Sequence, residues 1–481
     1  MLGNLLNFSD PSKNSYYFSF IIIMIIIILL IHLIKEYLGK KAQDLDIQMD
    51  KELSNNDDDN PMLISHKNSL KSRYLLAYII TRSAMWAEVP YLYYLLMTVH
   101  KFSFAEIGFL FLIYTIGALF FGTIIHKLAY KSGRKLFCHI YNFITIIKLL
   151  LLIQGVRILA YIAIIIASGF SPRFIKSIFE SWLINESERM FQNLQREKER
   201  FIKRSLIESH LFDGVFGIMT CVVCAFIYEK FGITYPFWIS IILSLLSSLV
   251  IKILWDENIL LRSDEEEGYN RLYGALKELK KLDILCIGLI EGLVIACINI
   301  YFFSWTPILK QSTNGEMNVG FIFTIMLLAK MTGFEFYHML IINLRFDYYT
   351  CIIVFLLLQG LVLFLIYYIN TFLSRIIFLS LFNGLFEFYF SLNSKIKSDI
   401  LVEQYKAIIK ILFTIPTNIY IIIIFLHLSF MNCFTLYLIS SIISLIAFVI
   451  GICLVIYIRI SKRNEENNEH EGYNHLMQHD N

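Results

Sequence analysis

The chain has 481 residues, of which 57% are hydrophobic and only 17% charged, and its formal net charge is +3. Soluble domains contain about 45–50% apolar and about 25% charged residues, so this composition excludes an ordinary soluble enzyme and indicates a polytopic membrane protein. The net charge by itself says little about partners; we expect a lipid bilayer and a small solute, and no nucleic acid.

The first apolar run covers residues 17–34 and contains no charged residue. It is long for a signal-peptide core and lacks a small-residue cleavage pattern, so we expect it to be retained as a transmembrane helix. A polar stretch follows over residues 35–73. Its acidic cluster at residues 55–60 is interpreted as part of a solvated linker rather than as a metal site.

Twelve further apolar runs follow, each near the length of about 20 residues that one bilayer crossing requires. Six precede and six follow a charged loop at residues 256–282. The sequence therefore predicts an all-α membrane protein with an N-terminal helix and linker (1–73), a six-helix bundle (74–255), a cytoplasmic central loop (256–282), a second six-helix bundle (283–458) and a disordered cytoplasmic tail (459–481). The runs cover residues 74–97, 106–126, 136–153, 158–182, 211–228, 236–255, 283–305, 319–341, 348–369, 372–392, 407–428 and 433–458.

Lysine and arginine gather in alternate loops, at residues 127–135, 189–204, 262–281 and 395–406, whereas the intervening loops carry roughly one base each. Because basic loops stay on the cytoplasmic side, both ends of the twelve-helix body are expected in the cytosol and residue 1 outside. We expect a multi-pass protein of the plasma membrane.

The fourth of the twelve runs contains the most informative charged cluster. Pro172 should kink or break the helix, and Ser171 would cap a restarted helix whose free N–H groups bind an anion. Arg173, Lys176 and Glu180 share one helical face, so the two bases would complete a site for a small oxyanion. The alternative is an ordinary proline kink in which Lys176 extends toward the cytosol and pairs with Glu180.

Charged groups inside a membrane cost at least about 2.5–3.5 kcal/mol at the helix centre, which makes them default candidates for a functional site. Arg82 and Trp86 share one side of the first of the twelve helices, where Arg82 would add positive potential to a cavity. Glu88, Glu180 and Glu291 are candidates for proton coupling; for Arg82 and Glu88 an ion pair with another helix is an equal alternative. Similar roles are open to Lys330, Glu335, His338, Glu387 and Lys410.

Several apparent motifs do not support an enzyme. Cys221 and Cys224 have redox spacing but lie within an apolar run, and His470 and His475 are five residues apart, which does not match a zinc-protease helix. The sequence contains no Walker loop or dinucleotide fingerprint. We therefore expect no enzymatic activity, no catalytic residue, no metal ion and no cofactor.

Six plus six helices around a cytoplasmic loop resemble the major facilitator superfamily. Gly122 followed by the Lys-Ser-Gly-Arg-Lys stretch at residues 131–135 is similar to the superfamily's loop between its second and third helices, with Tyr130 in place of the usual Asp. The resemblance implies that Gly133 and Arg134 take part in gating.

Shorter stretches resemble the molybdate-anion transporter family, in which an extra N-terminal helix also occurs. The resemblance implies a molybdate-like substrate and places Trp305 in the cavity. Three charged positions of the family are missing, because Met85, Ile164-Ile165 and Thr414 stand in their places. The matching stretches are Trp86 with Pro90-Tyr91-Leu92-Tyr93, Phe179-Glu180-Ser181-Trp182 with Glu186, Trp255-Asp256-Glu257-Asn258, Trp305-Thr306-Pro307, Gly320 with Phe323 and Gly333, and Ile415-Pro416 with Asn418.

The leading hypothesis is therefore a monomeric secondary active transporter that takes up a small oxyanion, by resemblance molybdate, through alternating access. Bringing a dianion into a cell that is negative inside costs about 4.6 kcal/mol per 100 mV, so uptake would need a coupled cation. One alternative is a transporter of a sugar or another organic solute. A second is a non-transporting receptor or scaffold that acts through the basic loop at residues 185–210.

Overall fold

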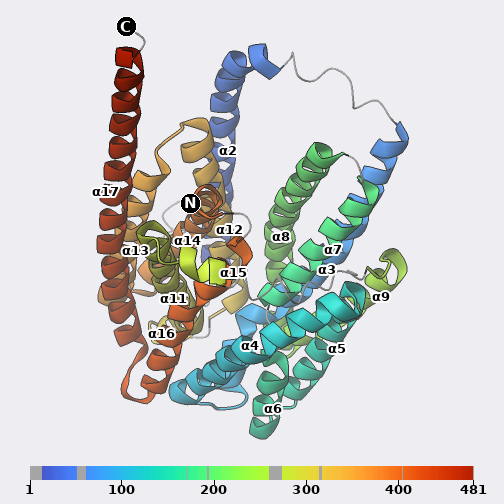
Figure 1. The fold of residues 1–481 in the computed structure, drawn as a ribbon. Coiled ribbons are helices and arrows are strands. Elements are labelled where there is room, and N and C mark those ends of the chain that lie inside the picture. The colour runs from blue at the N-terminus through green and yellow to red at the C-terminus, as the bar shows by residue number, and fades with distance from the viewer. Residues whose placement is uncertain are drawn as a thin grey trace. The chain divides into compact units, whose positions relative to one another are not determined.

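The computed structural model describes residues 14–50, 61–170, 172–191, 194–258, 273–313, 317–402 and 405–479. Within these ranges the chain is helical and contains no β-strand (Figure 1). Ten of the described helices are long and apolar enough to cross a membrane. Two shorter apolar segments accompany them: Phe104–Ala118, which is the first part of a longer helix, and Arg157–Ser168. The predicted all-α membrane fold is confirmed.

The chain divides into two compact units. The first comprises Met1–Ser263, Trp305–Thr332 and Ile424–Phe430, and the second comprises Asp264–Ser304, Gly333–Ile423 and Met431–Asn481. The predicted division into bundles at 74–255 and 283–458 stays a prediction. Up to residue 258 the helices are α2 (Asn14–Asp50), α3 (Pro61–Thr98), α4 (Phe104–Ser132), α5 (Arg134–Ile153), α6 (Arg157–Ser168), α7 (Pro172–Met190), α8 (Gln195–Phe231) and α9 (Tyr235–Leu254).

The remaining elements include two short irregular helices. They are α11 (Leu282–Lys310), α12 (Val319–Tyr337), the π-helix η1 (His338–Asn343), α13 (Tyr348–Tyr368), α14 (Phe372–Ile400), α15 (Lys406–Leu412), α16 (Thr414–Leu426), the 3₁₀-helix η2 (Leu428–Phe430) and α17 (Cys433–His479).

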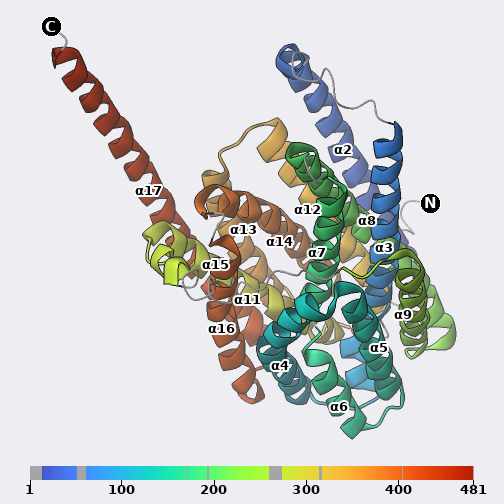
Figure 2. The ribbon, with the colours of Figure 1, turned by 45° about the vertical axis from the view of Figure 1, so that its right-hand side comes forward.

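The helices differ from the sequence prediction in several places, among them α8, which already begins at Gln195 within the predicted loop at 185–210. The run at 158–182 is divided into α6 and α7, and α7 begins at Pro172, where a helix restart was expected (Figure 2). The predicted linker is partly helical, because α2 extends to Asp50 and α3 begins at Pro61. The acidic cluster at 55–60 lies outside the described residues. α17 continues to His479, where a disordered tail was predicted; the Lys, Arg and Glu residues of that segment are good helix formers.

Hydroxyl groups and small residues hold neighbouring helices together. In the first unit, the Ser240 hydroxyl of α9 donates to the Ala84 carbonyl of α3 at 2.7 Å, and Ser247 bonds both Thr81 of α3 and Asn142 of α5. In the second unit, Ser441 of α17 donates to the Gly360 carbonyl of α13 at 2.8 Å. Lipid tails are as apolar as leucine, so close packing and such hydrogen bonds are what select one helix arrangement.

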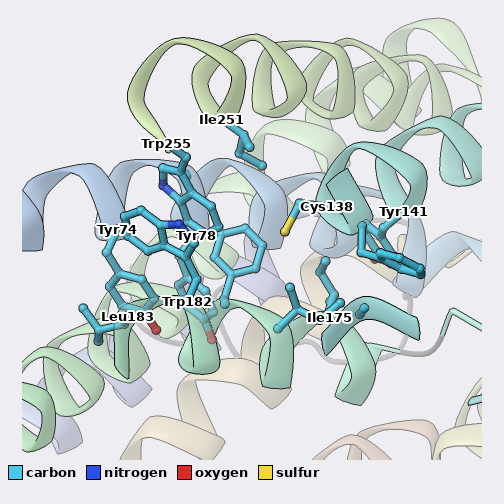
Figure 3. Close-up of a cluster of buried hydrophobic side chains, with 14 of the residues drawn as sticks. Tyr74, Tyr78, Cys138, Tyr141, Ile175, Trp182, Leu183, Ile251 and Trp255 are labelled. Atoms are coloured by element: carbon cyan, nitrogen blue, oxygen red, sulfur yellow. The ribbon is translucent and has the colours of Figure 1, made fainter. Parts of the chain in front are cut away.

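One aromatic core in the first unit joins α3 and α7 to the end of α9 (Figure 3). The indoles of Trp182 and Trp255 stack with ring centroids 3.9 Å apart and an interplanar angle of 8°. Phe179 meets Trp255 edge-on at 4.9 Å, and Tyr74 and Tyr78 extend the cluster along α3. This core fixes the chain where α9 ends.

Candidate functional site

A buried ion pair joins α3 to α8. Arg82 donates from Nε and one terminal nitrogen to the two carboxylate oxygens of Asp213, at 2.8 and 2.9 Å. Trp86 donates its indole N–H to the same carboxylate at 2.8 Å. Their side chains are nearly closed to solvent, with Arg82 11% and Asp213 4% exposed. Two-pronged Arg–carboxylate pairs are strong and geometrically specific, so Asp213 fixes both the guanidinium and the indole.

Aromatic rings and a second cation surround Trp86. The Arg82 guanidinium lies 5.1 Å and the Lys330 ammonium 5.8 Å from its ring centroid, within the range of cation–π attraction. Phe323 lies 5.9 Å from Trp86 and 5.7 Å from Trp305. All these residues belong to the first unit. They form a row of three rings beside a guanidinium, an ammonium and a carboxylate, which can recognise both flat apolar faces and polar groups.

Gly217 lets α8 approach this row. A Cβ at that position would come within 3.0 Å of the Trp86 indole nitrogen, so any larger residue would displace the ring. The indole position relative to Asp213 therefore depends on a residue without a side chain.

Two glutamates predicted for proton coupling lie in buried ion pairs with lysine. Glu88 of α3 accepts from Lys148 of α5 at 2.7 Å. Glu291 of α11 accepts from Lys397 of α14 at 2.8 and 2.9 Å. Each pair lies within one unit. For Glu88, as for Arg82, the structure shows the ion pair with another helix that the sequence left open.

The residues predicted to bind an oxyanion are only partly described. Ser171 and the side chain of Arg173 lie outside the described residues. Lys176 forms an ion pair with Glu180 at 3.8 Å, with the two side chains 47% and 35% exposed. This is the contact named by the ordinary-kink interpretation, and it compensates the charge of Lys176.

Gly133 and Arg134 contact the segment that follows α9. Arg134 is buried and donates to the Ser181 hydroxyl at 2.6 Å and to both oxygens of Asn258 at 3.1 and 3.2 Å. The Asn258 amide in turn donates to the Trp182 carbonyl and to Glu186. Three stretches that carried the family resemblance thus meet at one place in the first unit.

Glu257 completes this arrangement by capping α5. Its carboxylate accepts the backbone N–H groups of Lys135 and Leu136, each at 3.0 Å, which are among the unpaired donors of a helix N-terminus. Gly133 has φ +109°, and a Cβ there would lie 2.4 Å from the Glu257 carboxyl carbon. The Lys-Ser-Gly-Arg-Lys loop therefore requires glycine for both its backbone angle and its contact with Glu257.

Sequence reasoning missed Asp213, Lys148 and Lys397 as functional candidates. The signal was present for the first two, since each is a charged residue within an apolar run. Lys397 was assigned to a loop after residue 392, whereas α14 continues to Ile400. Among the described residues, no group of three or more His, Cys, Asp or Glu side chains is placed to hold a metal ion.

Comparisons with known proteins agree with this fold. The model of the MFS_5 family, described as sugar transporters with 12 transmembrane segments, matches residues 35–376; the match begins after the first apolar run. A variant of the nucleoside transporter NupG superposes with a TM-score of 0.65 at 15% identity, covering 80% of this chain and 99% of the other. The POT family transporter PepTSo gives 0.64 at 9% identity, covering 81% and 98%. The chain therefore belongs to the MFS_5 family of major facilitator transporters.

Proposed function

We propose that this transporter is secondary active, that it carries a small polar solute by alternating access, and that the Arg82–Asp213–Trp86 cluster forms part of its substrate site. The buried Arg82–Asp213 pair carries the proposal. Two charges buried between helices of a membrane protein are expensive and mark solute pathways by default, and the indole N–H bond ties them to an aromatic row.

The compensated charges favour a neutral organic solute such as a sugar. Arg82 is matched by Asp213 and Lys176 by Glu180. A guanidinium and a carboxylate side by side offer donors and acceptors to hydroxyl groups, while Trp86 and Trp305 offer flat apolar faces. The description of the MFS_5 family as sugar transporters supports the same solute class.

A molybdate-like oxyanion is the second candidate. Arg82 and Lys330 both lie against the Trp86 ring, and a dianion requires such positive groups. The stretches of sequence that resemble molybdate-anion transporters also support it. In this case Arg82 would exchange Asp213 for the substrate during transport.

We further propose that protons drive transport through the two Glu–Lys pairs. A protonated Glu88 or Glu291 carries no charge to attract its lysine, and a buried lysine without a counter-charge strongly destabilises the helix arrangement that holds it. Proton binding would therefore open the Lys148 or Lys397 contact and favour a different helix arrangement. Glu88→Gln and Glu291→Gln should abolish the dependence of uptake on a pH gradient while exchange across equal pH continues.

The substrate site is tested by uptake into proteoliposomes of purified protein, with a panel of labelled sugars and with molybdate measured by mass spectrometry. Arg82→Gln should reduce uptake at least tenfold, and Arg459→Gln, which removes an exposed arginine of the second unit, should leave it unchanged. Arg82→Lys keeps the charge but loses the two-pronged geometry, so it tests the site if the glutamine variant fails to fold. Normal uptake by a folded Arg82 variant would refute the site.

Competition then separates the two solute classes. If the substrate is a neutral organic solute, excess unlabelled sugar should inhibit uptake of the labelled substrate. If it is an oxyanion, molybdate or another tetrahedral dianion should inhibit it. Absence of uptake for every solute in the panel would refute both.

A further inference from the structure

The first part of α8, Gln195–His210, carries four exposed basic side chains that the transport proposal does not use. Arg196, Arg200 and Arg204 recur at four-residue spacing, and Lys203 lies beside them. We call these four residues the basic ridge. Arg204 is 81% exposed although it also reaches Glu208. The exposed acid of the same segment, Glu199, accepts a hydrogen bond from Gln195.

Two ion pairs fix this segment to α3. Lys67 pairs with Glu197 at 2.7 Å and Lys71 with Glu208 at 2.8 Å, and α3 and α8 run side by side (Figures 1 and 2). Glu197 and Glu208 are thus engaged by lysines of α3, and the four side chains of the basic ridge remain exposed. A fixed helix presents its charges in a constant geometry, unlike a flexible basic loop.

An apolar face continues directly from the basic ridge along the same helix. Ile207, Leu211, Val215 and Met219 follow Lys203 at four-residue spacing and are 38% to 56% exposed. Side chains of this kind on a membrane-spanning helix face lipid tails. At about 1.5 Å per residue, the basic ridge begins about 5 Å beyond Ile207 and ends about 16 Å beyond it. The headgroup layer is about 5–8 Å thick on each side, and long basic side chains extend back toward it.

We propose that the basic ridge binds the phosphate groups of anionic phospholipids in the cytoplasmic leaflet. Clustered Lys and Arg next to the cytoplasmic end of a transmembrane helix attract such headgroups, and here the exposed apolar face supplies the adjoining contact for the acyl chains. The inference uses the predicted cytoplasmic location of this segment and does not depend on which solute is carried.

Native mass spectrometry of the detergent-purified chain tests this proposal, with palmitoyl-oleoyl phosphatidylserine and the matching phosphatidylcholine as probes. The wild-type chain should retain phosphatidylserine at least tenfold more strongly, and Arg196→Gln/Arg200→Gln/Lys203→Gln should remove most of that preference. The matched control, Lys277→Gln/Lys280→Gln/Lys281→Gln, neutralises three exposed lysines elsewhere and should keep it.

Inorganic phosphate distinguishes a lipid site from a simple anion site. At millimolar concentration it should not displace the bound lipid, because the proposed site also requires acyl chains; displacement by phosphate would overturn the proposal. Equal binding of both lipids, or equal loss of preference in the two triple variants, would overturn it as well. Lipid binding is measured without transport, so the result of this test does not depend on whether the uptake assay succeeds.

Discussion

Replacing Gly133 by alanine gives a sharp test of the contact between the α4–α5 loop and Glu257. Gly133 has φ +109° and ψ 140°, a region that side chains rarely adopt at a cost of about 1–3 kcal/mol. The new Cβ would also lie 2.4 Å from the Glu257 carboxyl carbon. Glu257 would have to move, and α5 would lose its carboxylate cap, which is worth about 0.5–2 kcal/mol.

Gly232→Ala is the matched control. Gly232 has φ +103° and ψ 179°, and a Cβ there meets nothing within 4 Å. Gly232→Ala should lose only the free energy that a side chain costs at a positive φ angle. The free energy of unfolding of the Gly133 variant should therefore be lower than that of the Gly232 variant by about 0.5–2 kcal/mol. In a domain of moderate size, each kcal/mol lowers the melting temperature by about 2–4 °C.

Thermal melts of the purified chains in detergent, followed by tryptophan fluorescence, measure this difference. In a Glu257→Ala background the clash and the cap are both absent, so Gly133→Ala should then cost only as much as Gly232→Ala. Equal melting temperatures for the two single variants, or an unchanged Gly133 penalty in the Glu257→Ala background, would refute the reasoning.

Two other predictions concern charge. Asp213→Asn leaves the buried Arg82 guanidinium without its counter-charge, and breaking such a pair typically costs about 3–5 kcal/mol. Gel filtration and thermal melts should show a large loss of stability in this variant and a partial recovery in Asp213→Asn/Arg82→Gln. A stable single variant would contradict this prediction. Burial lowers the pKa of His100 from its usual 6.5, so the folded chain holds it neutral while the unfolded chain takes up a proton. Stability should therefore fall between pH 7.5 and 5.5, by at most about 1.4 kcal/mol per pH unit from this residue, and an unchanged pH slope in His100→Gln would exclude its contribution.

The transmembrane helices were accessible from sequence because each needs about 20 apolar residues and satisfies its backbone within one segment. The helix start at Pro172 was predictable for a similar reason, since proline acts on its own turn. The helical part of the predicted linker could not be predicted from sequence. Its Lys67 and Lys71 pair with glutamates of α8, and the local composition of the linker does not reveal those distant partners.

The candidate site shows the same limit. Arg82, Trp86 and Glu88 stood out as polar residues in an apolar run, but whether each faces a substrate or a partner helix depended on residues far along the chain. Arg82 meets Asp213 across 131 positions and Glu88 meets Lys148 across 60. A charge in a membrane must be compensated, and only the packing of the helices decides which group compensates it.

Hydropathy and short motifs are local properties of the chain, so they were enough to establish the membrane class, most of the apolar helices and the resemblance to major facilitator transporters. Folding was needed to pair Arg82 with Asp213, to join Glu88 and Glu291 to buried lysines, and to bring Gly133, Arg134 and Glu257 together beside α5. These contacts follow from long-range packing, in which the free energy of a buried charge or a capped helix end depends on groups that the chain brings together only when it folds.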